Sequence, residues 1–215
     1  MNHLSKSLLP ELPESALLSL PEKVLQFGTG ALLRGLPDFF IDQANRQGIF
    51  NGRIVVVKST SSGDVAAFEK QDNLYTIAVR GIENGEPVSQ NLISTAISRV
   101  LSAQQQWQDV LACAANPALE IVISNTTEVG IQLVRENIRQ EPPASFPGKL
   151  LAFLLARYRA FHGDVSKGLV IVPTELVTDN GDLLESIILE LAHLNKLEYN
   201  FIEWLENACT FCNSL

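Results

Sequence analysis

Two glycines, Gly28 and Gly30, join an apolar segment to a helix-like one in the sequence VLQFGTGALLRG, residues 24–35. Glycine at such a turn lets the backbone approach a pyrophosphate, and the helix that follows offers free N–H groups and a partial positive charge. Leu33 stands where the usual dinucleotide motif has its third glycine. The pattern predicts a phosphate-binding turn, and a tight bend between two buried elements is the alternative.

The second strand-like run, RIVVVKST, carries no acid at its end. A dinucleotide site has an Asp or Glu there to bind the adenosine ribose, whereas this chain has Lys58, Ser59 and Thr60. Asp64 lies close behind and is interpreted as a loop acid or a helix cap in preference to a ribose ligand. Lys58 is expected to be a solvated strand-end residue, with recognition of a phosphorylated ribose as the alternative.

Polar residues also follow two further apolar strands, in SNTTEVG (124–130) and PTELVTDNG (173–181). Open parallel sheets bind ligands at the carboxyl ends of their strands, so both clusters are candidates for one site. Glu175 is the more informative acid, because it follows an apolar run directly and lies well before the helix expected from about Asn180. Helix capping is the alternative for these residue types.

The remaining reactive side chains form no catalytic or metal-binding constellation. Cys209 and Cys212 have the C-x-x-C spacing, but they stand in an apolar helix-like segment without a second ligand pair. The three histidines are scattered along the chain. Core packing is therefore expected for the cysteines, and no metal site is predicted.

The elements that must position these residues alternate between apolar strands and amphipathic helices, which predicts a parallel sheet covered on both faces. Asn84-Gly85 adds the turn of a β-hairpin. The expected fold is α/β, a Rossmann-type doubly wound, mostly parallel sheet with an inserted β-hairpin, in one domain over residues 1–215. Strands are expected at 23–27, 51–60, 118–128 and 167–175, helices at 31–48, 102–116, 146–163, 180–196 and 199–211, and the hairpin at 74–94.

Composition excludes several classes of partner. The chain of 215 residues carries a net charge of −8, which argues against nucleic acid or an anionic membrane as its main partner. No stretch approaches a membrane span, and prolines and acids interrupt the first 23 residues, as they would not in a signal peptide. Three cysteines fit a reducing compartment, so a cytoplasmic location is expected.

Several segments together, in order from about residue 20, resemble the N-terminal domain of the long-chain polyol dehydrogenases, the mannitol dehydrogenase group. They are VLQFGTGALLRGL, IVVVKST, DNLYTIAVRGIENGE, SNTTEVGI, FPGKLLAFLLARY, GLVIVPTELVTDNG and FIEWLENACTFCNSL. The resemblance implies NAD as the cofactor and the interconversion of a secondary alcohol and a ketone. It also explains Leu33 as a variant that the family shares.

The resemblance assigns residues to a site. It places on the cofactor Phe27, Gly28, Thr29, Gly30, Ala31, Leu32, Leu33, Arg34, Asn125, Thr126 and Thr127, and on the substrate side Glu128 and Glu175. Three positions depart from the family pattern: Asn125 replaces a threonine, Glu175 an aspartate and Leu176 an asparagine. The departure at Leu176 removes a hydrogen-bonding group.

In this family a second, mostly helical domain carries the catalytic lysine, so the resemblance implies no catalytic residue within residues 1–215. It implies a small sugar-acid substrate shared with that domain, and an apolar face toward it through which this chain could self-associate. Another family substrate, such as fructuronate or mannitol, is one alternative. A non-catalytic interaction module that lacks NAD binding is another.

Overall fold

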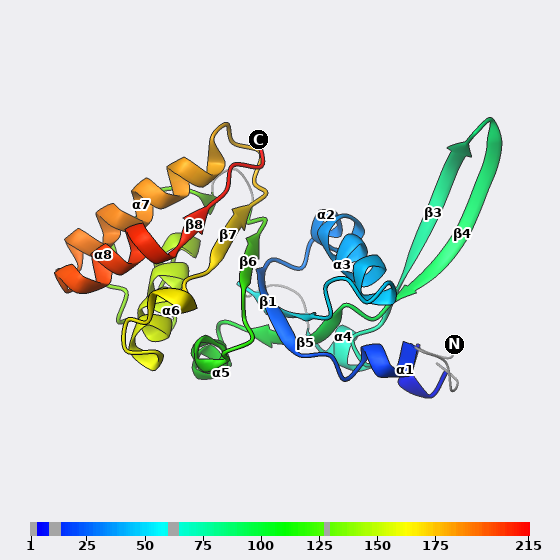
Figure 1. The fold of residues 1–215 in the computed structure, drawn as a ribbon, viewed down its shortest axis with the longest axis horizontal. Coiled ribbons are helices and arrows are strands. Elements are labelled where there is room, and N and C mark those ends of the chain that lie inside the picture. The colour runs from blue at the N-terminus through cyan, green and yellow to red at the C-terminus, as the bar shows by residue number, and fades with distance from the viewer. Residues whose placement is uncertain (1–3, 9–13, 60–64, 127–129) are drawn as a thin grey trace.

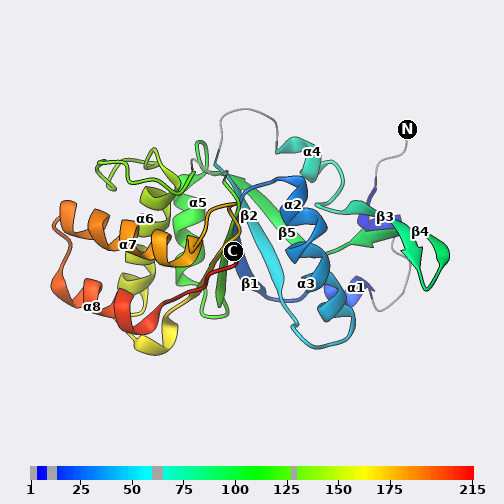
Figure 2. The same cartoon turned by 90° about the horizontal axis from the view of Figure 1, so that it is seen from above.

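The computed structural model describes residues 4–8, 14–59, 65–126 and 130–215. Within them lies a six-stranded parallel sheet in the order β5-β2-β1-β6-β7-β8 (Figure 1 and Figure 2). The order of these six strands along the chain gives the arrangement 3-2-1-4-5-6, which confirms the Rossmann-type fold. The strands are β1 (Glu22–Phe27), β2 (Arg53–Lys58), β5 (Ile97–Ser102), β6 (Ile121–Ser124), β7 (Val170–Pro173) and β8 (Thr210–Phe211).

Helices connect these strands and cover both faces of the sheet, as the view in Figure 2 makes clear. The α-helices are α1 (Glu14–Leu17), α2 (Ala31–Gly35), α3 (Pro37–Arg46), α4 (Ala66–Glu69), α5 (Trp107–Ala112), α6 (Phe146–Ala160), α7 (Asn180–Leu194) and α8 (Tyr199–Ala208). The 3-10 turns are η1 (Lys6–Leu8), η2 (Cys113–Ala115) and η4 (Val165–Lys167).

The central strands divide their side chains between two cores, as alternation along a strand requires. Leu25 and Val55 enter a large core beneath α5, α6, α7 and α8. Val24 and Ile54 enter a smaller core on the side of α2 and the hairpin base. Gln26 falls on this second side and is fully buried, so the smaller core contains a polar group directly under the turn that follows β1.

The hairpin is confirmed. Strands β3 (Tyr75–Glu83) and β4 (Glu86–Ser94) pair antiparallel around Asn84 and Gly85, both at positive φ. Positive φ at both central residues is the geometry for which Asn-Gly is favoured in a two-residue hairpin. Figure 1 shows this hairpin projecting away from the body of the molecule.

Two expected helices differ from the structure, and one strand was not predicted. The helix predicted over 31–48 is two helices, because Pro37 begins α3 and the preceding Leu36 cannot stay helical (ψ −84°). The helix predicted over 199–211 ends at Ala208, and its last residues form β8. The strand β5 lies between the predicted hairpin and the next predicted helix and was missed, because its sequence ISRVLS mixes polar and apolar residues.

One buried cation stabilises the large core. Arg157 of α6 is 1% exposed, and its guanidinium donates to the carbonyls of Ala114, Asn116, Leu119 and Lys167 at 2.7–3.1 Å. Arginine suits this position because its five N–H groups form a rigid, planar set of donors. Arg157 thereby joins the loop before β6 to the loop before β7, which aligns the two strands that end at the site described next.

Candidate functional site

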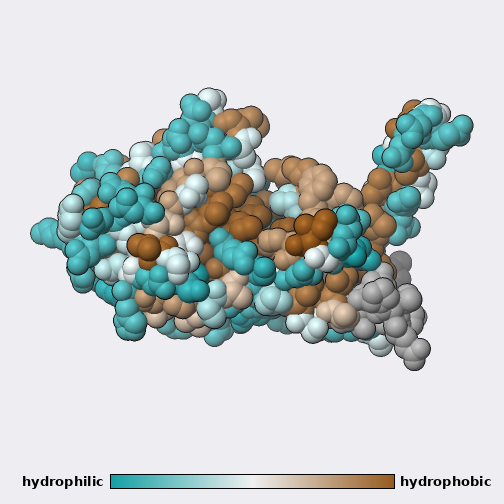
Figure 3. Space-filling model, viewed as in Figure 1, coloured by the Kyte–Doolittle hydropathy of each residue, from teal (hydrophilic) through white to brown (hydrophobic). Residues whose placement is uncertain are grey.

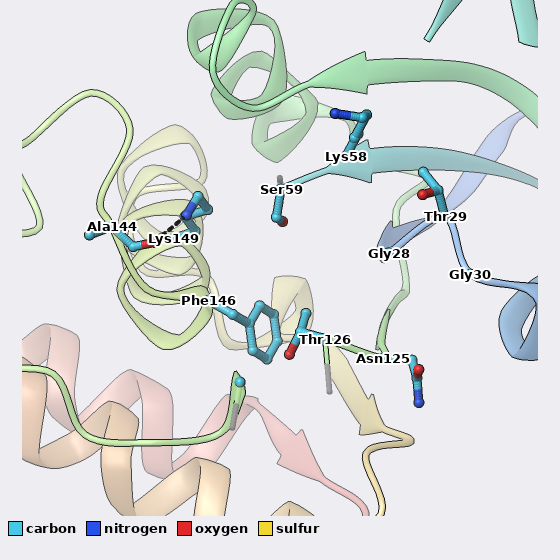
Figure 4. Close-up of a pocket in the computed structure, with 11 residues that line it drawn as sticks. Gly28, Thr29, Gly30, Lys58, Ser59, Asn125, Thr126, Ala144, Phe146 and Lys149 are labelled. Carbon is cyan, nitrogen blue, oxygen red and sulfur yellow. Dashed lines mark hydrogen bonds between the residues drawn. The ribbon is translucent and has the colours of Figure 1, made fainter. Parts of the chain in front are cut away.

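A cavity of about 350 Å³ lies at the carboxyl edge of the sheet, where the chain reverses its strand order (Figure 4). Parallel strands all end at this edge, so the cavity collects loops that are distant in sequence. It is lined by Gly28, Thr29, Gly30, Lys58, Ser59, Asn125, Thr126, Gly130, Ala144, Phe146 and Lys149. Of the eleven predicted site residues that the structure describes, five therefore line one cavity.

The glycine turn is held against the end of β6. The N–H of Gly28 donates to the carbonyl of Val57 at 3.1 Å, and the N–H of Asn125 donates to the carbonyl of Phe27 at 3.0 Å. Gly28 has φ +129°, and a Cβ atom there would lie 2.8 Å from the carbonyl oxygen of Asn125. Only glycine fits this close approach.

Gly30 serves a different purpose from Gly28. Its backbone is extended (φ −67°, ψ 163°), and a Cβ atom there would meet nothing within 4 Å. It is the residue before the first turn of α2 and faces the cavity. The absent side chain therefore leaves open space at the residue that precedes α2, as a phosphate ligand at a helix N-terminus would require.

Glu175 is turned into the protein and holds the loop after β6. It is 1% exposed. One carboxylate oxygen accepts the backbone N–H and the hydroxyl of Thr126, both at 2.9 Å, and the other accepts the hydroxyl of Ser124 at 3.1 Å. Asn125 is fixed from the same side by donating to the carbonyl of Thr174 at 2.7 Å. The carboxylate thus positions backbone that lines the cavity. The assignment of Glu175 to the substrate side remains a prediction.

Lys149 lines the cavity, and the sequence analysis did not single it out. It stands in the first turn of α6 and is 2% exposed, with its Nζ donating to the carbonyl of Ala144 at 2.7 Å (Figure 4). Burial lowers the pKa of its ammonium group, and the nearby Glu136 opposes that shift. A lysine inside an otherwise apolar helix segment, FPGKLLAF, was the available signal.

The interpretation of Lys58 as a solvated strand-end residue was wrong. The residue is 8% exposed and lines the cavity together with Ser59. The hydroxyl oxygen of Ser59 is buried and has no hydrogen-bond partner in the described part of the chain. The end of β2 therefore forms one wall of the candidate site, together with the turn after β1 and the loop after β6.

The other predicted residues lie around the cavity. Phe27 is fully buried, with its ring centroid 5.3 Å from that of the cavity-lining Phe146. Leu33 is buried behind the turn, while Ala31 and Leu32 face outward. Thr127, Glu128 and Asp64 lie outside the described residues.

Arg34 borders a different cavity, of about 210 Å³, at the base of the hairpin. Its guanidinium lies 5.7 Å from the ring centroid of Phe68 and 5.9 Å from that of Tyr75. The hydroxyl of Tyr75 donates to the carbonyl of Arg34 at 3.0 Å. Its predicted contact with the cofactor stays a prediction.

The described residues contain no group of three or more His, Cys, Asp or Glu side chains placed to hold a metal ion. The cysteines at 113, 209 and 212 are free thiols, and Cys209 is buried in the large core. None of the helices in the described ranges combines the length and apolar character needed to cross a membrane.

Sequence comparison relates the chain to a dehydrogenase family. The family model described as the mannitol dehydrogenase Rossmann domain matches residues 22–215. The chain belongs to this family. The description of this model as a Rossmann domain agrees with the 3-2-1-4-5-6 order of the sheet.

Within the mannitol dehydrogenase family, curated relatives include two altronate oxidoreductases. The protein of Bacillus subtilis (strain 168) is 43% identical over 196 residues, and that of Halalkalibacterium halodurans is 44% identical over 198 residues. Each match covers 91% of this chain but only 41% and 39% of the respective relative. The chain thus spans about two fifths of the length of these relatives.

A solved structure shares the fold. Mannitol 2-dehydrogenase of Pseudomonas fluorescens, in a ternary complex with NAD and D-mannitol, superposes with a TM-score of 0.81 at 20% identity. The superposition covers 98% of this chain and 46% of that protein.

The two glycines of the turn are expected to differ in their effect on stability. Gly28→Ala places a methyl group against the Asn125 carbonyl in a backbone region that L residues avoid, and should lower the free energy of unfolding by roughly 2–4 kcal/mol. Gly30→Ala enters open space and should change it by about 0.5 kcal/mol or less. Urea denaturation of both variants measures this, and equal losses would contradict the geometry.

Proposed function

We propose that this chain is the NAD-binding domain of an oxidoreductase that interconverts D-altronate and D-tagaturonate in hexuronate breakdown. The observation that carries the proposal is its identity of 36–44% to altronate oxidoreductases over 91% of the chain. The cavity beside the glycine turn supplies the place for the cofactor. Residues 1–215 are taken as one such domain.

The residues that line the cavity fit a dinucleotide. The backbone at Gly28–Gly30 lines the space that a pyrophosphate would occupy, directly before the first turn of α2. Lys58 and Lys149 add positive charge, and no carboxylate is among the described lining residues. NAD, when bound, supplies the hydride chemistry. The chain's own part is to bind it and to hold its two ends at the edge of the sheet.

Around this site the acids have separate roles. Glu175 is a positioning residue, since both its oxygens are used to hold Thr126 and Ser124. Thr127 and Glu128 follow Thr126 in the sequence, and we propose that they contact the nicotinamide and the substrate. The group that transfers the proton is assigned to the part of the relatives that this chain does not match. Substrate choice between altronate, fructuronate and mannitol is assigned to that part as well.

A bulky residue at Gly30 is expected to abolish NADH binding. Gly30→Val should fill the space in front of α2 while leaving the melting temperature within about 2 °C of the wild-type value, because a Cβ atom at this position has no neighbour within 4 Å. Isothermal titration with NADH provides the measurement. Gly35→Val, at a second glycine with open space but on the far end of α2, is the matched control and should bind as the wild type.

If neither NADH nor NADPH gives heat with folded wild-type protein, NAD binding is overturned and the chain is better explained as an interaction module.

The isolated chain is expected to bind NADH without turnover. Lys58 and Lys149 are the ionisable side chains among the described residues that line the cavity, and the proposal gives neither of them a proton-transfer role. The measurement is the decrease in NADH absorbance on adding D-tagaturonate, with a full-length altronate oxidoreductase as the positive control. Steady oxidation that co-purifies with this chain through successive columns would contradict the division of roles.

Apolar side chains are exposed beside the proposed site. Leu32, Leu36 and Phe40 of the α2–α3 segment are 49%, 48% and 60% exposed, and Leu176 after β7 is 72% exposed. Figure 3 shows apolar surface around α2, α3 and the ends of β6 and β7. Contiguous patches of this kind mark contacts with other protein surfaces. We propose that this face is the one through which the chain contacts a catalytic domain or, alone, a second copy.

Self-association is therefore expected at high protein concentration. Sedimentation velocity should show a concentration-dependent increase in weight-average mass for the wild type, and Phe40→Asp should reduce it by exposing a charge in the patch. Ile82→Asp, at an exposed apolar residue near the hairpin tip, is the control. A wild type that stays monomeric throughout would contradict the expectation.

A further inference from the structure

A fully buried polar pair lies beneath the glycine turn. Gln26, in β1, and Asp38, in the first turn of α3, are both 0% exposed. The side-chain amide of Gln26 donates one N–H to the carbonyl of Gly28 at 3.2 Å and reaches Asp38 Oδ2 at 3.4 Å. The amide orientation is set by the Gly28 carbonyl, which can only accept. Asp38 is thus linked to the turn through a single side chain.

The pair leaves two oxygens without partners. Gln26 Oε1 and Asp38 Oδ1 are buried, and neither has a hydrogen-bond partner among the described residues. Unpaired buried oxygens are rare and costly, so two of them on side chains already in contact call for an explanation. A single proton on the carboxyl group would give both oxygens a hydrogen bond, because a carboxylic acid and a primary amide can pair through N–H···O and O–H···O bonds at once.

We infer that Asp38 carries a proton in the folded protein and, through Gln26, positions the carbonyl of Gly28 for dinucleotide binding. The proton lies on Oδ1 and is donated to Gln26 Oε1. This leaves the second amide N–H of Gln26 free to hold the Gly28 carbonyl. Asp38 is accordingly a positioning residue, and its effect on the ligand rests on the function proposed above.

The surroundings favour the protonated form. Burial raises the pKa of Asp38 from 3.8 to about 7, and Gln26, Arg34 and Tyr75 only partly oppose that rise. Arg34 comes from α2 and Tyr75 from β3, while Asp42, one turn along α3, pairs with Arg46 at 2.7 Å. The pKa of the Tyr75 hydroxyl is raised, first by burial and then by the negative charges of Asp38 and Asp42.

Loss of the proton should weaken ligand binding for two reasons. The carboxylate would repel Gln26 Oε1 and attract its N–H groups away from the Gly28 carbonyl. It would also place a negative charge in a low-dielectric region directly beneath the space proposed for a pyrophosphate. Affinity should therefore fall as pH rises through neutrality.

The first test needs no ligand. A carboxyl whose pKa is higher in the folded than in the unfolded chain makes the free energy of unfolding fall with rising pH between those two values. Thermal melts from about pH 4.5 to 8.5 should show this loss in the wild type. Asp38→Asn keeps the shape of the side chain and a hydrogen-bond donor but cannot ionise, and its melting temperature should not show this fall with rising pH. Identical pH profiles for the two proteins would overturn the protonation.

Binding provides the second test. The Kd for NADH should be roughly 3- to 10-fold higher at pH 8.5 than at pH 6 in the wild type, and nearly constant in Asp38→Asn. Asp42→Asn is the matched control: it removes a buried carboxyl from the same helix face without touching Gln26, and it should keep the wild-type ratio. Equal ratios in the wild type and Asp38→Asn would overturn the link to the turn.

The two proposals fail in different ways. If NADH binds no variant at any pH, the proposed function fails, and the link of Asp38 to the ligand fails with it, while the melts still decide whether Asp38 is protonated. Difference infrared spectra supply a readout that does not depend on folding energetics. A protonated carboxyl band in the wild type at about pH 6, absent from Asp38→Asn, supports the inference, and its absence from the wild type contradicts it.

Discussion

The close approach of the first glycine of the turn to the end of β6 is the constraint on which the site depends. The space between Gly28 and the Asn125 carbonyl is too small for any side chain. It is there because β1 and β6 are hydrogen-bonded neighbours at the point where the strand order reverses. That contact brings the start of α2 and the loop after β6 to the same cavity, and the rest of the site is arranged around the two.

The walls of the cavity come from elements that only a parallel sheet brings together. Glu175, beyond β7, holds the loop after β6, and Lys149 enters from the first turn of α6. Arg157 does not line the cavity; it donates hydrogen bonds to carbonyls in the loops that precede β6 and β7. Buried charged groups are costly unless they are paired or hydrogen-bonded, and each of these three is used to fix backbone or neighbouring side chains. These contacts hold the described backbone on the β6–β7 side of the cavity.

The two faces of the sheet have different characters. The face toward α5–α8 is an apolar core of ordinary composition. The face toward α3 buries Asp38, Asp42 and Asn45, while Leu36 and Phe40 are exposed and Ile41 packs partly buried against the smaller core. On α3 a polar residue, Asp38, is buried and an apolar residue, Phe40, is exposed, which is the reverse of the usual pattern. This arrangement produces both the polar pair under the turn and the exposed apolar surface beside it.

By itself the sequence determined the fold class, the hairpin turn and the glycine pair, because strand and helix periodicity and Asn-Gly chemistry are local properties. It also carried the family membership, through seven segments in order. Only the tertiary structure decided which way Glu175 faces, that Lys58 and Lys149 line a cavity, and that Asp38 rather than Phe40 is buried on α3. Those facts depend on which loops meet at the sheet edge and which helix face meets the sheet. Such contacts join residues far apart in the chain, and no local pattern encodes them.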